Sequence, residues 1–214
     1  GSYVYAGEGE VMEQRNWHRQ TSVHNTVTLD NKNLETTESV TKLWQPEGNI
    51  QTLVTENPSY KNFKHRRSVF FVDNTYFVIV DEVSGSAKGS VNLHYQMPKG
   101  EIANSREDMT FLTQFEDGSN MKLQCFGPEG MSMKKEPGWC STAYRKRYKR
   151  MNVSFNVKKD NENAVRYITV IYPVKKSADA PKFDAKFKNK TFDENGLEIE
   201  VKVNGKKQSL KYKL

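Results

Sequence analysis

The chain has 214 residues, which suits one all-β domain or such a domain with a small appendage. A mean hydropathy of −0.82 is polar for a globular protein, but 11% aromatic residues and frequent apolar alternation argue against disorder. No run approaches the ~20 apolar residues that cross a bilayer, so we expect no membrane-spanning segment. The formal net charge of +7 favours polyanions: nucleic acid, anionic membrane or sulfated polysaccharide.

The first predicted element is a strand over residues 17–30. Read at period two, Val23, Val27 and Leu29 share one face and His24 projects from the other. A lone strand histidine is usually solvated or hydrogen-bonded. Because this one lies opposite the predicted core and between small hydroxyl residues, it is a candidate metal ligand or ligand contact.

Alternating apolar residues predict strands along most of the remaining chain, and we expect no helix. Residues 67–81 read as a hairpin with a tight turn at Asp73–Asn74, and nearly continuous apolar residues place it centrally, covered on both faces. Asn204–Gly205 is a second strong turn signal. Further strands are predicted at residues 40–44, 50–55, 91–97, 111–115, 121–126, 151–157, 167–172, 197–203 and 209–214.

Ten or more short strands at this spacing predict an all-β fold, an antiparallel β-sandwich. We expect residues 1–214 to form a single domain, with a small subregion at about 176–214 packed on it. Cys125 and Cys140 lack a Cys-x-x-Cys spacing, which excludes a zinc ribbon; one disulfide and two free thiols both remain open.

Two basic runs are candidate anion contacts. Residues 61–67, which contain His65, are more typical of a solvated approach to a strand. Residues 144–150 hold five cations among seven residues, and guanidinium forks fit sulfate oxygens bidentately. The alternative is that this run only solvates a strand edge. The candidate substrate-binding residues are Trp139, Arg145, Lys146 and Arg147.

The segment from Arg19 to Asp30, with His24-Asn25-Thr26 at its centre, resembles the His-Asn-Thr segment of the heparinase II/III-like polysaccharide lyases, and the heparinase III branch is the most similar. Weaker matches are the opening Gly1–Gly7, Trp139 with Ser141 and Tyr144, Val170–Val174, and the closing residues 203–207 with Leu210 and Tyr212.

The resemblance implies the C-terminal β-sheet domain of a lyase whose N-terminal part is an α/α toroid. Such enzymes cleave heparan sulfate or heparin by β-elimination at uronate. Their catalytic residues lie on the toroid and on a sheet segment upstream of Gly1, so we expect no catalytic residue here and no activity from this chain alone. His24 maps onto a metal ligand of the family, which implies one divalent ion, zinc or calcium, in the intact enzyme. The implied partners are a sulfated glycosaminoglycan and the toroid, and the implied location is periplasmic or secreted.

Two other function classes compete with this interpretation. One is a non-catalytic carbohydrate-binding or structural β-sandwich. The other is a nucleic-acid binder, which the charge permits but no motif supports, so we expect no nucleic-acid partner.

Overall fold

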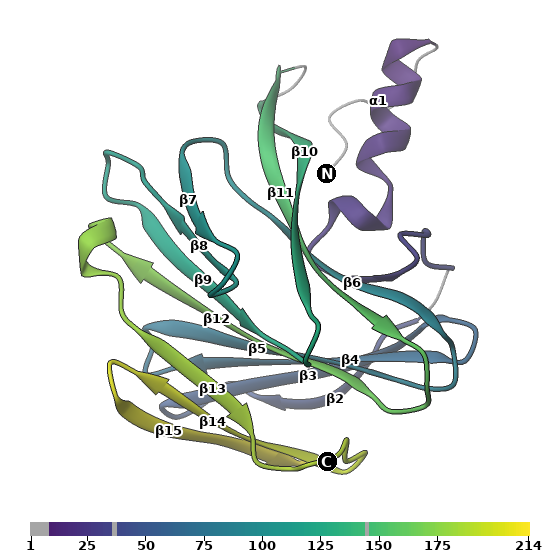
Figure 1. Cartoon of the computed structure of the whole chain (residues 1–214), viewed down its shortest axis with the longest axis vertical. Coiled ribbons are helices and arrows are strands. Elements are labelled where there is room, and N and C mark those ends of the chain that lie inside the picture. Colours follow the sequence, from purple (N-terminus) through teal and green to yellow (C-terminus); the bar gives the residue numbers. More distant parts are fainter. Residues whose placement is uncertain (1–8, 36–37, 144–145) are drawn as a thin grey trace.

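The computed structural model describes residues 9–35, 38–143 and 146–214. Three antiparallel sheets make up most of this part of the chain (Figure 1). The four-stranded sheet has the order β1 (Val27–Leu29), β6 (Gly89–Gln96), β11 (Lys146–Lys159), β10 (Ser132–Ala143). The central sheet has the order β2 (Val40–Gln45), β3 (Ile50–Tyr60), β4 (Phe63–Val72), β5 (Tyr76–Ser84), β12 (Val165–Val174), β9 (Asn120–Phe126), β8 (Thr110–Thr113), β7 (Ile102–Ser105). The three-stranded sheet has the order β13 (Phe183–Phe187), β14 (Gly196–Val203), β15 (Lys206–Lys213).

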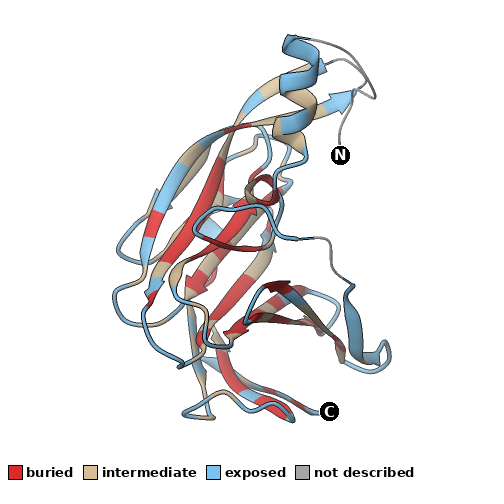
Figure 2. Ribbon diagram, turned by 90° about the vertical axis from the view of Figure 1, so that its right-hand side faces the viewer, coloured by how far each residue is buried: buried red, intermediate tan, exposed pale blue. Residues whose placement is uncertain are grey.

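The central sheet is the middle layer, because each of its faces contributes to a different hydrophobic core. Toward the four-stranded sheet, Tyr167 and Phe111 pack with Leu93 and Phe155. Toward the three-stranded sheet, other central-sheet residues such as Phe70 pack with that sheet's strands. The alternation of buried and exposed residues along these strands is visible in Figure 2. Period-two patterning therefore explains both interfaces.

The predicted hairpin at residues 67–81 forms β4 and β5 in the middle of the central sheet. Its turn residues Asp73 and Asn74 have φ of 49° and 50°, the left-handed region that a tight hairpin turn requires. Coverage on both faces holds for most of the hairpin but fails near the turn, where Phe77 is 40% exposed. There Phe77 stacks on Phe71, with the ring centroids 4.5 Å apart.

The expectation that residues 61–67 form a solvated run is wrong. His65 is 3% and Arg66 1% exposed, because both lie within β4 and pair with buried carboxylates of β5. Arg66 donates from Nε and Nη2 to Glu82 Oε2 at 2.9 and 2.6 Å. Its Nη2 also donates to the carbonyl oxygens of Asp193 and Gly196, which ties the three-stranded sheet to the central one.

The expectation of no helix and of a strand over residues 17–30 is also wrong. Glu10–His18 forms α1, Thr21–Val23 a 3₁₀ turn, η1, and only Val27–Leu29 is a strand. None of the residues of α1 is buried, so no apolar stripe marks the helix in the sequence. Acidic residues in its first turn and basic residues in its last favour the helix electrostatically. No helix in the described ranges has the length and apolarity to span a membrane.

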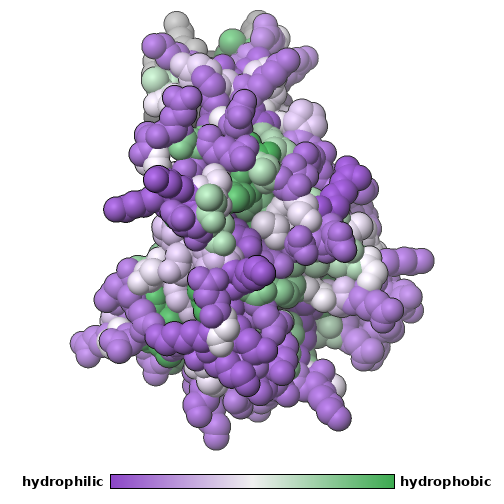
Figure 3. Space-filling view, turned by 60° about the vertical axis from the view of Figure 1, so that its left-hand side comes forward, coloured by the Kyte–Doolittle hydropathy of each residue, from purple (hydrophilic) through white to green (hydrophobic). Residues whose placement is uncertain are grey.

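The remaining details complete the layers. η2 (Ser177–Asp179) leads from β12 toward β13, and the predicted Asn204–Gly205 turn joins β14 to β15 with φ of 49° and 81°. Cys125 and Cys140 are both free thiols. Hydrophilic side chains dominate the face seen in Figure 3, with small apolar patches between them, as the low mean hydropathy predicts.

Candidate functional site

His24 lies in the irregular segment between η1 and β1, with its side chain exposed. Its Nε2 is 3.1 Å from the carbonyl oxygen of His18 at the end of α1. Because a carbonyl oxygen can only accept, Nε2 carries the hydrogen of this bond. The neutral ring therefore keeps its free lone pair on Nδ1, where it can accept a proton or bind a metal ion.

The two residues after His24 are held by the sheets. Asn25 accepts twice: its carbonyl oxygen from Arg67 Nη1 at 2.5 Å, and its Oδ1 from the backbone N–H of Gln96 at 2.7 Å. The carbonyl of Thr26 accepts from the backbone N–H of His94 at 2.9 Å. The His24 segment is thus attached to β4 and β6 although it is not itself a strand.

Arg67 is oriented by a fully buried carboxylate, Asp81. Arg67 Nε donates to Asp81 Oδ1 at 2.7 Å and Nη2 to Oδ2 at 3.2 Å, while His65 Nε2 donates to Oδ1 at 2.6 Å. Burial alone would raise the pKa of Asp81, but the Arg67 charge and the bonds from His65 and Arg67 outweigh it and lower the pKa to about 2. The carboxylate is therefore ionised at neutral pH and fixes the guanidinium.

A polar hollow of about 270 Å³ lies beside His24, and we call it the His24 hollow. It is lined by His18, Val23, His24, Asn25, Gln96, Trp139, Cys140, Ser141 and Arg150. Arg150 donates from Nη2 to Gln96 Oε1 at 3.0 Å. His24 also lines a second hollow of about 680 Å³ with Arg19 and Gln20. Two of the predicted site residues, His24 and Trp139, therefore meet in one place.

The predicted basic residues extend this end of the molecule. The Arg147 guanidinium lies over the Trp139 ring, 4.0 Å from its centroid, and Nη2 of Arg147 is 3.7 Å from Glu10 Oε1 of α1. Lys146 is exposed at the start of β11, and Arg145 lies outside the described residues. Burial is the largest cause that lowers the pKa of His18, and the charges of Arg147 and Arg150 are among those that lower it further. This end is therefore electropositive.

A family model described as "Heparinase II/III-like, C-terminal" matches residues 1–186. The chain belongs to this family. The resemblance seen in the sequence is thereby confirmed.

Curated relatives and solved structures agree with the assignment. The chain is 88% identical over its whole length to a "Heparin-sulfate lyase" of Bacteroides stercoris, and 34% identical over 97% of its length to one of Pedobacter heparinus, covering 32% of each protein. "Crystal Structure of Heparinase III" matches 100% of this chain and 33% of that one, with 30% identity and a TM-score of 0.93. The heparan sulfate lyase HepC structure from Pedobacter heparinus matches 100% of this chain and 34% of that one, with 31% identity and a TM-score of 0.90. The chain thus spans about a third of these relatives, and the predicted antiparallel β-sandwich is confirmed.

His24 is the predicted metal ligand of this heparinase II/III-like chain. The described ranges contain no group of three or more His, Cys, Asp or Glu side chains placed to hold a metal ion. Its surroundings nevertheless fit a ligand, because metal-binding imidazoles commonly donate their second N–H to a carbonyl, as His24 does to His18. The metal assignment stays a prediction.

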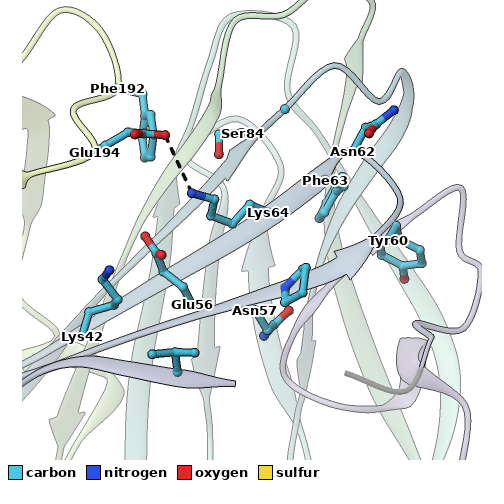
Figure 4. Close-up of a pocket in the computed structure, with 13 residues that line it drawn as sticks. Lys42, Glu56, Asn57, Tyr60, Asn62, Phe63, Lys64, Ser84, Phe192 and Glu194 are labelled. Carbon is cyan, nitrogen blue, oxygen red and sulfur yellow. Dashed lines mark ion pairs between the residues drawn. The ribbon is translucent and has the colours of Figure 1, made fainter. Parts of the chain in front are cut away.

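A more apolar hollow of this family member lies elsewhere, over β2, β3 and β4 (Figure 4). It has a volume of about 610 Å³, and its lining includes Tyr60, Phe63 and Phe192. Lys64 and Glu194 form an ion pair of 3.7 Å at its rim. Its described lining contains no histidine and no cysteine.

Sequence reasoning missed several residues of the site. Gln96 lines the hollow from a strand whose pairing the sequence does not reveal, and Arg150 belongs to the predicted basic run but was not singled out as a site residue. Asp81 carried a signal, since it is a carboxylate directly after the apolar run of β5, where an unpaired charge would be costly.

Proposed function

We propose that this chain is the β-sandwich part of a lyase that cleaves heparan sulfate, heparin or a related uronate polymer by β-elimination. In this proposal His24 serves as a metal-site or cleft histidine, and the cations of β10 and β11 contact the polysaccharide. Residues outside this chain complete the catalytic site, so the chain alone is inactive.

One observation carries the proposal. More than a hundred residues of sequence separate His24 from Trp139 and Arg147. All three nevertheless lie at one electropositive end of the molecule. The relatives that share this fold are heparin-sulfate lyases. As that name says, their substrate is a sulfated polymer, and its charge is complementary to this end.

The chemistry divides between this chain and the missing part. β-Elimination needs a charge partner for the uronate carboxylate, a base for the C5 proton and an acid for the leaving 4-oxygen. Guanidinium groups such as those of Arg147 and Arg150 suit sulfate or carboxylate oxygens. The Trp139 face offers a stacking surface for a sugar ring. No tyrosine is among the described residues that line the His24 hollow, and we assign the acid and the base to the toroid and the upstream sheet segment.

The proposal extends to a metal ion and to location. His24 Nδ1 would hold one divalent ion, zinc or calcium, together with ligands upstream of residue 1, since zinc sites use three or four protein ligands. Such an ion would supply positive charge at the domain boundary.

A sulfated glycosaminoglycan is an extracellular polymer, and we propose a periplasmic or secreted enzyme that binds neither nucleic acid nor membrane.

The test compares the chain with its longer parent. The 214-residue chain should release no unsaturated uronate product from heparan sulfate, whereas the parent should do so. In the parent, His24→Ala should lower the metal content or the activity at least about tenfold, as loss of a ligand or an oriented contact does. The control is Lys211→Ala, which replaces an exposed side chain of β15 far along the chain from His24. Wild-type metal content and activity in the His24 variant would contradict the role of His24.

The alternative is a carbohydrate-binding sandwich without a catalytic partner. It predicts heparin retention by the chain together with a parent that degrades no glycosaminoglycan. Stronger retention on DNA than on heparin at equal salt would instead favour a nucleic-acid binder.

A further inference from the structure

The side chain of Arg67 donates three hydrogen bonds to two groups on different segments. Nε and Nη2 bind the two oxygens of Asp81 on β5, and Nη1 donates to the carbonyl oxygen of Asn25, next to His24. The ion pair with Asp81 alone would satisfy the buried carboxylate. The third bond is an addition that only a group with several donors in a fixed fork can make.

Asn25 is held from a second direction. Its Oδ1 accepts from the backbone N–H of Gln96 on β6, so a main-chain atom and a side-chain atom of the same residue are fixed by different sheets. Ser22, two residues before His24, is held as well, since its carbonyl accepts from Gln96 Nε2 at 3.0 Å. Both sides of His24 are thereby attached to the sandwich.

These attachments fix an otherwise irregular segment. His24 is exposed, and its ring bonds through Nε2 to the His18 carbonyl. An exposed imidazole on a free loop would sample several rotamers and both neutral tautomers. Here the backbone is held on both sides of His24, so the ring stays within reach of the His18 carbonyl and keeps its hydrogen on Nε2.

We propose that Arg67 is a positioning residue for His24, acting through the carbonyl of Asn25 while Asp81 and His65 hold its guanidinium in place. This inference rests on the proposed function, in which His24 belongs to the working site. The buried Asp81 carboxylate then does more than stabilise the fold, because it orients the Arg67 guanidinium that holds the segment with Asn25 and His24.

The variant Arg67→Lys distinguishes a positioning role of Arg67 from a role in stability alone. An ammonium group can pair with Asp81, but its single nitrogen cannot bind that carboxylate in bidentate fashion and also reach the Asn25 carbonyl. Arg67→Lys should therefore melt closer to the wild type than Arg67→Met does. Both variants should nevertheless release Asn25.

Two measurements on the 214-residue chain report this release. A long-range proton–nitrogen NMR spectrum of the imidazoles, taken at mildly alkaline pH, should show His24 as the Nε2–H tautomer in the wild type and as a mixture in Arg67→Lys. The backbone amide of Gln96, which donates to Asn25, should exchange about tenfold faster with solvent, as loss of one hydrogen bond implies.

Arg166→Met is the matched control. Arg166 pairs with a fully buried carboxylate, Glu82, at 2.8 Å, and binds carbonyls of the 189–191 segment instead of Asn25. Each carboxylate keeps another partner when its arginine is replaced, since Arg66 holds Glu82 and His65 holds Asp81. This variant should lose stability and leave the His24 spectrum unchanged.

The outcomes separate the two claims. A His24 tautomer and a Gln96 exchange rate that stay at wild-type values in both Arg67 variants would overturn the positioning role. In the longer parent, Arg67→Lys should lower the metal content or kcat several-fold, and wild-type values for both would also overturn it. If instead Arg67→Lys changes the His24 spectrum but the parent His24→Ala keeps full metal content and activity, the proposed function of His24 fails.

Discussion

Arg147 lies over the indole ring of Trp139, with the guanidinium carbon 4.0 Å from the ring centroid. The two residues are on the paired strands β11 and β10, whose hairpin projects above the sandwich in Figure 1. Stacking holds the flat guanidinium while leaving its edges available to anions. One edge lies 3.7 Å from the exposed carboxylate of Glu10, a contact that a polyanion can replace.

Removing the cations of this hairpin should weaken heparin binding. Lys146→Ala with Arg147→Ala should elute from a heparin column at lower salt, with affinity reduced by about tenfold, because two charge contacts are lost. Adding Arg145→Ala should lower retention further. The control is Lys206→Ala with Lys211→Ala, which removes two exposed lysines from β15. Equal elution of both pairs would take the hairpin out of the site.

The sheets could be predicted from the sequence because alternation reports burial directly. The structure contains the predicted hairpin at residues 67–81 and the predicted turn at Asn204–Gly205. Both could be predicted because turn chemistry and period-two alternation are local signals. The assembly of the site could not be predicted in the same way. Trp139 reaches His24 only because β11 pairs with β6, which in turn pairs with β1.

The wrong prediction of a continuous strand through His24 has a physical reason. Val23, Val27 and Leu29 have the spacing of a strand face, and all three are indeed buried. The backbone between Val23 and Val27 is nevertheless irregular, because the Asn25 side chain takes the Gln96 N–H that a strand neighbour would have bonded through its backbone. His24 is exposed as predicted, but through side-chain bonds of Asn25 and Arg67 that sequence periodicity does not report.

Asp81 should make the protein sensitive to acid between about pH 4 and pH 2. Its pKa in the folded state is lowered to about 2, so the unfolded chain binds the proton first as the pH falls. The stabilisation is complete above the unfolded value and is lost as the pH falls through the folded value. Urea unfolding in this range should show a decrease of about 2 kcal/mol.

Asp81→Asn should remove this dependence and be less stable at neutral pH, because Arg67 then lacks its anionic partner. Asp184→Asn is the control, since Asp184 is half exposed and pairs with Lys202 at the surface. It should leave the acid dependence in place. An acid profile that is the same in wild type and Asp81→Asn would contradict the assignment.

The two thiols should differ in reactivity. Cys125 is 2% exposed, and its burial raises the pKa of the thiol, so little thiolate forms. Cys140 is half-buried and lines the His24 hollow. A thiol reagent should therefore modify one cysteine rapidly in the folded protein and both after denaturation. Protection of the single modified thiol by heparin oligosaccharides would link Cys140 to the bound polymer, and Cys140→Ser should abolish the rapid phase.

Because of His94, the protein should lose stability as the pH falls from about 6.5 to about 4. Its side chain is 1% exposed, Nε2 lies 2.8 Å from Thr28 Oγ1, and burial lowers the pKa to about 4. The unfolded chain takes up this proton near the ordinary histidine value, whereas the folded protein does not. The free energy of unfolding should therefore fall by about 3 kcal/mol across this window. His94→Gln should reduce this pH-dependent loss of stability. An NMR titration of the wild type should find the His94 ring neutral down to about pH 5, because burial without an anionic partner disfavours the charged imidazole. A ring that titrates near the ordinary histidine value would refute the assignment.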